Sequence, residues 1–194
     1  SYYGRVRLLD TLKRYERWSE LVALTDSPYL EPTDKEEEQI RRLTHRGIAL
    51  AHLHRVDGVN EVLADLQQRL EKEQAQAAEE KRKHEEEVAK AKKEGKKPPA
   101  KKKPSGEDLV KRLEKAIANI EGRLAVEYGE YKRALRMLRK AGDDKFYIAH
   151  VQLLAGETDA ALKAIAEQVK SRENQVHTLA VQIEMLHHAG KTEE

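Results

Sequence analysis

The sequence contains no cysteine, which excludes disulfide bonds, thiolate metal ligands and a cysteine nucleophile. Aromatic residues are scarce, with one Trp, one Phe and seven Tyr. No apolar run approaches the roughly 18 residues that a membrane span needs, and the N-terminus lacks the apolar core of a signal peptide. The net charge of only +2 provides no global field for binding a polyanion. The sequence therefore predicts a soluble segment of open localisation.

Helical periodicity is what the sequence does contain. Leu, Ala, Glu, Lys and Arg dominate, and no sustained period-2 alternation of β-branched residues is present. Apolar residues recur at helical spacing, as in Val59, Val62 and Leu66. Thr33 or Asp34 is the expected N-cap of a helix whose first turn is acidic. The pattern predicts an all-α fold of antiparallel helix hairpins.

Composition divides the chain into four parts. Residues 71–94 carry eight acidic and seven basic residues without an apolar stripe, which predicts a charged helical arm exposed to solvent. Residues 95–105 contain one Gly and three Pro among lysines, which predicts a linker. We therefore expect N-terminal helical repeats in 1–70 and C-terminal repeats in 106–194.

A repeated pattern surrounds several glycines. "GEYKRALRML" from Gly129 aligns with "GETDAALKAI" from Gly156 and with "GKTEE" from Gly190, and the last two glycines are 34 residues apart. We expect two further turns near Arg14 and His54. Seven residues before three of these turns stands a small residue. A second recurrent position stands five residues after three of the turns and four residues after Arg14. The first set is Gly47, Gly122 and Ala149, and the second is Trp18, Val59, Ala134 and Ala161. Small residues at such positions allow two antiparallel helices to approach closely.

This spacing resembles the tetratricopeptide repeat family, whose unit is a helix–turn–helix of 34 residues that stacks into an α-solenoid. The resemblance is to a degenerate array, because the intervals are irregular and Trp18 stands where the family keeps a small residue. A generic α-solenoid or a helical bundle is the alternative. The sequence stops shortly after Gly190, so we expect a truncated last repeat and a chain that is a piece of a larger multidomain protein.

The resemblance also implies a binding groove, because the first helix of each pair lines a concave surface in that family. The matching positions mix Arg, Asn and His with apolar residues, which suits an extended peptide of some acidic character. The alternative is that these residues pack against a neighbouring helix. They are Arg41, Thr44, Ile48, His52, Asn119, Arg123, Val126, Glu127, Phe146, His150, Leu153, His177, Glu184 and His188.

No catalytic, cofactor or metal site is predicted. His84 begins a string like the zinc motif H-E-x-x-H, but Val88 stands where the second His belongs. "AGKTEE" resembles the end of a phosphate-binding loop, but Met185 replaces the upstream glycine. No Ser/His/Asp arrangement can be ordered from the sequence, so we expect no enzyme activity in this segment.

Eight lysines between Lys90 and Lys103 form the most basic stretch of the chain. Such a cluster can bind nucleic acid or anionic lipid. However, no aromatic residue lies between Arg69 and Glu127, so there is no base-stacking platform, and residues 90–106 contain no Arg, the bidentate phosphate ligand. These absences favour a solvated spacer over a nucleic-acid or membrane site.

Stacked helical repeats present long, rigid surfaces that suit binding. The sequence therefore predicts a protein–protein interaction scaffold whose partner is a protein, a peptide or a second copy of the chain. One alternative is a self-association or structural module attached to an enzymatic domain outside this segment. A second is a nucleic-acid or anionic-membrane binder that uses the Lys-rich linker.

Overall fold

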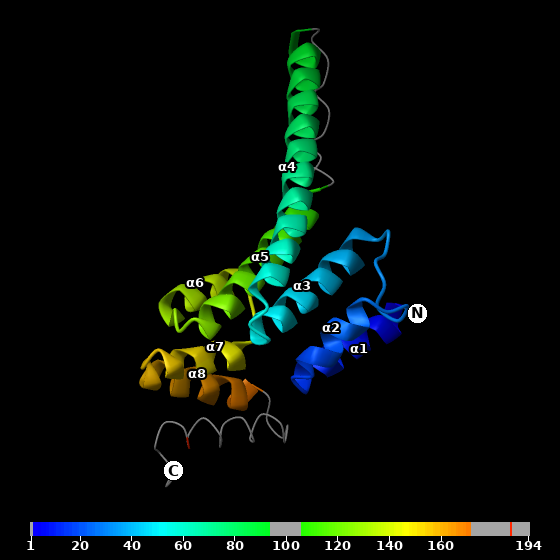
Figure 1. Ribbon diagram of the computed structural model, residues 1–194. Helices are drawn as coiled ribbons and strands as arrows, with labels where there is room; N and C mark the ends of the chain where they lie inside the picture. The colour runs from blue at the N-terminus through cyan, green and yellow to red at the C-terminus, as the bar shows by residue number, and fades with distance from the viewer. Residues whose placement is uncertain (1, 94–105, 172–186, 188–194) are drawn as a thin grey trace.

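The computed structural model describes residues 2–93, 106–171 and 187, and throughout these residues the regular structure is helical (Figure 1). The predicted all-α class is confirmed. The helices are α1 (Tyr2–Arg14), α2 (Trp18–Thr25), α3 (Glu36–His52), α4 (Val56–Lys93), α5 (Glu107–Glu127), α6 (Tyr131–Ala141), α7 (Lys145–Leu154) and α8 (Thr158–Ser171).

Four helix hairpins are closed by the same backbone turn. Three residues separate α1 from α2, α3 from α4, α5 from α6 and α7 from α8, and the middle residue of each loop is left-handed. In the third turn Gly129 has φ +72°, and the amide of Glu130 donates to the carbonyl of Ala125 at 2.8 Å. This pairing is a Schellman cap, which satisfies the last carbonyls of a helix. The left-handed residues of the other turns are Glu16, His54 and Gly156.

The expected first turn near Arg14 lies two residues too early. Arg14 is the last residue of α1, and Glu16, with φ 53°, holds the left-handed position. No glycine marks this turn, so the sequence pattern misplaced it. Counted from Glu16, the position five residues later belongs to fully buried Leu21 and not to Trp18. Trp18 is only half-buried and stacks on another side chain, described below.

Glycines allow α5 to pack closely against α6 and against α3. A Cβ on Gly122 would lie 2.8 Å from Cγ of Leu138 in the hairpin partner α6, as the predicted close approach requires. Gly47 makes a different contact. A Cβ there would lie 2.5 Å from Cδ1 of Ile120. The missing side chain at Gly47 therefore allows close packing of α5, which belongs to the next hairpin, and not of the hairpin partner α4.

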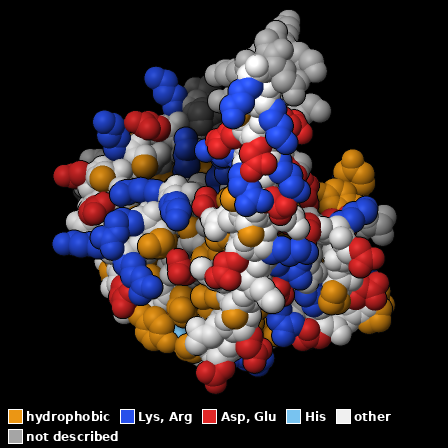
Figure 2. Space-filling model, turned by 90° about the horizontal axis from the view of Figure 1, so that it is seen from above, with side chains coloured by type: hydrophobic (Ala, Val, Ile, Leu, Met, Phe, Trp, Pro, Cys, Tyr) orange, Lys and Arg blue, Asp and Glu red, His pale blue; other side chains and the backbone are white. Residues whose placement is uncertain are grey.

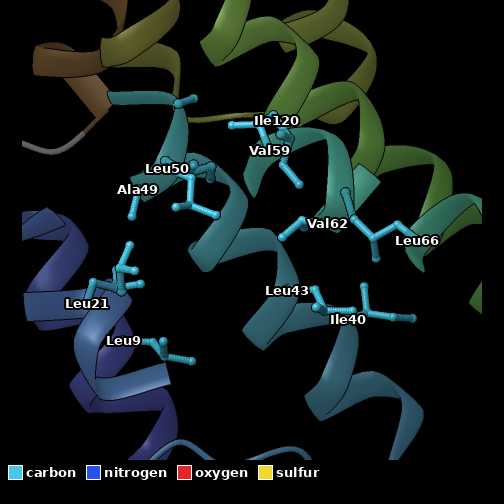
Figure 3. Packing of buried hydrophobic residues seen from close by; sticks show 14 of the residues in the cluster. Leu9, Leu21, Ile40, Leu43, Ala49, Leu50, Val59, Val62, Leu66 and Ile120 are labelled. Carbon is cyan, nitrogen blue, oxygen red and sulfur yellow. The ribbon is translucent and has the colours of Figure 1, made fainter. Parts of the chain in front are cut away.

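The largest hydrophobic cluster joins the helices on both sides of residues 94–105. It contains buried side chains from α1 to α4, among them Leu21, Ile48 and Leu66, together with Leu113 and Ile120 of α5 (Figure 3). Helix α5 packs against both α3 and α4. Two smaller clusters continue the core through α6, α7 and α8. The N-terminal and C-terminal helices therefore share one continuous packing arrangement.

The charged arm continues α4 as a helix. Its buried residues end at Leu70, after which the helix extends away from the other helices as far as Lys93 (Figure 1). Acidic and basic side chains alternate on its surface (Figure 2). Lys83 pairs with Glu79 at 2.8 Å, one turn earlier, and such pairs contribute about 0.2–0.5 kcal/mol each to an exposed helix. Helix α4 covers the segment predicted as an arm as far as Lys93, whereas the predicted linker lies outside the described residues.

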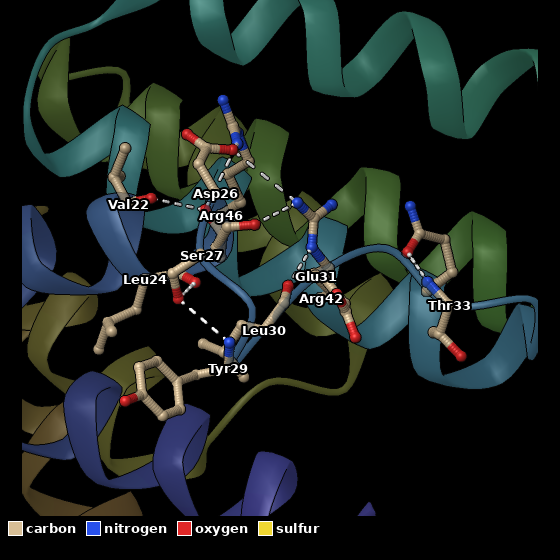
Figure 4. A network of polar contacts seen from close by, with 12 residues as sticks. Val22, Leu24, Asp26, Ser27, Tyr29, Leu30, Glu31, Thr33, Arg42 and Arg46 are labelled. Atoms are coloured by element: carbon tan, nitrogen blue, oxygen red, sulfur yellow. Dashed lines mark hydrogen bonds and ion pairs between the residues drawn. The ribbon is translucent and has the colours of Figure 1, made fainter.

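The connection between α2 and α3 is held by a buried arginine. Nε of Arg42 donates to the carbonyl of Leu30 at 2.6 Å, and its Nη2 donates to the carbonyl of Thr25 (Figure 4). The N-cap prediction for α3 was wrong, because Lys35 occupies that position without a side-chain cap. The hydroxyl of Thr33 instead accepts from the amide of Lys35 at 3.3 Å. The expected acidic first turn is present.

Candidate functional site

Eleven of the fourteen predicted groove residues lie in the described part of the chain, and they fall into two classes. Three of them are buried, as expected if they pack against a neighbouring helix instead of lining a groove: Ile48, Arg123 and Phe146. The remaining eight are half-buried on α3, α5 and α7: Arg41, Thr44, His52, Asn119, Val126, Glu127, His150 and Leu153. His177, Glu184 and His188 lie outside the described residues.

A buried ion pair links α5 to the connection between α6 and α7. Nη2 of Arg123 donates to Oδ2 of Asp143 at 2.6 Å, and the two side chains are 5% and 4% exposed. The guanidinium also lies over the ring of Tyr147 on α7, with Cζ 3.3 Å from the ring centroid. Nζ of Lys13, at the end of α1, approaches the other oxygen of Asp143 at 3.8 Å. One carboxylate thus joins α1, α5 and the start of α7.

A second polar group lies near the first and joins α2, α3 and α5. The imidazole of His52 stacks on Trp18 with ring centroids 4.4 Å apart, and its Nδ1 lies 2.8 Å from Oε1 of Glu127. Nε2 of His54, in the α3–α4 turn, lies 3.5 Å from Oε2 of the same carboxyl group. We call the eight residues of these two groups the central polar cluster: Lys13, Trp18, His52, His54, Arg123, Glu127, Asp143 and Tyr147.

Burial and nearby positive charge determine ionisation in the central polar cluster. Burial lowers the pKa of His52 to about 4, and the charges of Arg123, His54 and Lys13 act in the same direction. The imidazole is therefore neutral at pH 7, with its Nδ1 next to the Glu127 carboxyl group. Burial raises the pKa of the Glu127 carboxyl group, although His54 and Arg123 oppose this effect. Burial by itself would raise the pKa of the Asp143 carboxyl group. The positive charges of Arg123 and Lys13 outweigh this effect, so the pKa lies below its usual range.

Two polar atoms, one in this cluster and one on α5 before it, are buried without a hydrogen-bond partner among the described residues. They are Nε2 of His52 and Oδ1 of Asn119, which lies one helical turn before Arg123 on α5. In the same part of the chain, no group of three or more His, Asp or Glu side chains is placed to hold a metal ion. What the cluster does physically is fix the relative positions of α1, α3, α5 and α7 through directional contacts.

The sequence pattern identified His52, Arg123 and Glu127 but not their partners. Lys13 and Asp143 lie far apart in the sequence and outside the aligned repeat positions, so no periodicity connects them. His84, the zinc-motif candidate, stands on the exposed arm. Within the described helices, no segment combines the length and the apolar character that crossing a bilayer requires.

Comparison of the chain with models of protein families, with curated proteins and with solved structures finds no match in any of the three.

Proposed function

We propose that this chain is a protein-interaction scaffold: a degenerate array of helix hairpins, similar to tetratricopeptide repeats, that binds an extended peptide along α3, α5 and α7. The observation that carries this proposal is that all four hairpins share one three-residue turn with a left-handed middle residue, at Glu16, His54, Gly129 and Gly156, although the same Schellman cap also ends α6 at Gly142. The shared turn gives the four hairpins the same internal connection, and hairpins that stack present a long surface.

The rigidity of the inner helices supports the same proposal. Arg123, Asp143 and Tyr147 fix the end of α5 against α7, and Gly47 seats α5 against α3. A surface that is ordered before binding loses less conformational entropy when the partner arrives. The central polar cluster is then a structural element that shapes the surface rather than the binding residues themselves.

The accessible residues indicate the character of the peptide. Arg41 is half-exposed on α3 and, within the described residues, has no carboxylate within ion-pair distance. It is available to an acidic side chain, whereas the charge of Arg123 is already compensated by Asp143. Half-buried Val126 on α5 and Leu153 on α7 offer apolar contacts. We therefore propose a peptide that alternates acidic and apolar residues.

The test is selection of binders from a random peptide display library with the full chain, followed by hydrogen–deuterium exchange. Selected peptides are expected to protect amides of α3, α5 and α7 and to lose affinity for the Arg41→Glu variant. The control Arg55→Glu reverses an exposed charge outside the proposed groove. Failure to enrich any peptide, or protection confined to the α4 arm or α8, would refute the groove.

A further inference from the structure

Helix α6 carries the most one-sided charge of the described helices. Five of its eleven residues are basic, all five are exposed, and it contains no acidic residue. They are Lys132, Arg133, Arg136, Arg139 and Lys140. Figure 2 shows blue side chains gathered on that side of the arm where α5 and α6 lie in Figure 1. We call these five residues the α6 basic surface.

Two of the five cations are compensated, and three are not. Arg133 pairs with Glu130 at 2.8 Å, and Arg139 approaches Glu157 at 4.0 Å. Lys132, Arg136 and Lys140 have no carboxylate within ion-pair distance among the described residues. These three stand four residues apart, so they share one face of the helix and form a stripe about 12 Å long.

A hollow lies beside this stripe and contains an aromatic ring. It is shallow and open to solvent. Its lining consists of Gly129, Glu130, Tyr131, Lys132, Arg133, Arg136 and Ala155. Tyr131 is half-exposed there, and Tyr128, in the turn before α6, is 59% exposed. Cations of both types and aromatic rings therefore occur together, which is the combination that the lysine-rich linker lacks.

We propose that the α6 basic surface binds single-stranded nucleic acid, with phosphates along Lys132, Arg136 and Lys140 and a base against Tyr131. Protein partners require apolar anchors that become buried at the centre of the interface, and only charged side chains stand along the stripe. Nucleic acid takes its affinity from phosphate neutralisation, and aromatic stacking tolerates any base. This surface is formed by the second helix of its hairpin and is separate from the proposed peptide groove.

The test is fluorescence anisotropy of the full chain with labelled single strands of about 16 nucleotides, the upper end of usual site sizes, over a range of salt concentrations. Three neutralised phosphates predict a slope of log K against log[salt] of about −2 for a single strand. Reversing all three charges, in Lys132→Glu/Arg136→Glu/Lys140→Glu, is expected to weaken binding more than tenfold and to bring the slope close to zero. RNA and DNA strands are measured separately, and a preference between them identifies the source of the ligand.

The matched control is Arg7→Glu/Arg55→Glu/Lys163→Glu, which reverses three exposed charges elsewhere and leaves the same net charge. It is expected to bind within about twofold of the wild type, since it retains the phosphate contacts. Tyr131→Leu is expected to weaken binding about fivefold or more, whereas Tyr131→Phe retains the aromatic face and the affinity. Thermal unfolding establishes that each variant is folded.

Three results would overturn the proposal. Equal losses in the two triple variants would mean that net charge alone, including that of the unchanged linker lysines, determines binding. If the wild-type chain does not bind the oligonucleotide at low salt, the α6 basic surface is not a nucleic-acid site. Displacement of the oligonucleotide by polyglutamate at equal charge concentration would show that the surface recognises acidic protein.

Discussion

Removing the negative charge of Asp143 tests whether the central polar cluster holds the helices together. Asp143→Asn keeps the size of the side chain but leaves the Arg123 guanidinium, 5% exposed, without its counter-charge. Lys13 loses the same partner. Breaking a buried ion pair from one side costs about 3–5 kcal/mol, because an uncompensated charge stays buried. For a protein of this size each kcal/mol corresponds to about 2–4 °C in Tm, so we expect a decrease of roughly 6–20 °C.

Urea unfolding at pH 7, monitored by circular dichroism, measures this free energy, because the lowered pKa of Asp143 keeps the carboxylate ionised there. The matched control is Glu130→Gln, which breaks the exposed pair with Arg133, whose side chains are 52% and 49% exposed. Exposed pairs contribute about 0–1 kcal/mol, so this variant should unfold close to the wild type.

A double variant separates the missing charge from other effects of the substitution. The variant Asp143→Asn/Arg123→Met no longer contains the uncompensated guanidinium. Replacing a buried ion pair with uncharged residues often changes the free energy of unfolding little. We expect the double variant to recover much of the stability lost in Asp143→Asn. A single-variant loss no larger than that of Glu130→Gln, or a double variant less stable than the single one, would refute the reasoning.

Three further changes probe the close contacts, the imidazole and the loop. Gly122→Ala forces a methyl group against Leu138 and should cost about 1–3 kcal/mol in urea unfolding. Gly58→Ala, whose methyl group would meet the Leu50 side chain at 3.2 Å and no backbone atom, should cost less than Gly122→Ala. Because His52 titrates near pH 4 in the folded chain and near 6.5 when unfolded, the unfolded state binds more protons between these values. Stability should therefore fall by up to about 3 kcal/mol as pH decreases through this range, and His52→Gln should lack this component in a pH series of unfolding curves. Arg42→Met removes the donors of two buried carbonyls and should cost about 2–4 kcal/mol, with faster amide exchange in residues 26–35.

Helices and most turns were predictable because their signals are local. The amphipathic spacing of Val59, Val62 and Leu66 identified a buried helical face, and Gly129 and Gly156 identified left-handed turns. The left-handed turn at Glu16 was not predictable, since a glutamate at that position carries no such signal and only the hairpin contacts hold it there.

The candidate site was predictable only in part. The positions taken from the family resemblance include Arg123 and Glu127, two members of the central polar cluster on α5. However, the pattern could not distinguish buried Ile48 from half-exposed Arg41, because that depends on which helix packs alongside. The α6 basic surface could have been found from the sequence, since "YKRALRMLRK" places its cations opposite Ala134, Leu135 and Leu138.

The sequence by itself determined the helical class, the hairpin turns at glycine and the charged arm, because each depends on residues within a few positions of one another. Only the tertiary structure decided that α5 joins the N-terminal core through Ile120 and that Lys13, Arg123 and Asp143 share one buried site. The physical reason is that burial and charge pairing arise between residues distant in the chain. A charged side chain has no fixed role until packing determines whether water or a counter-charge surrounds it.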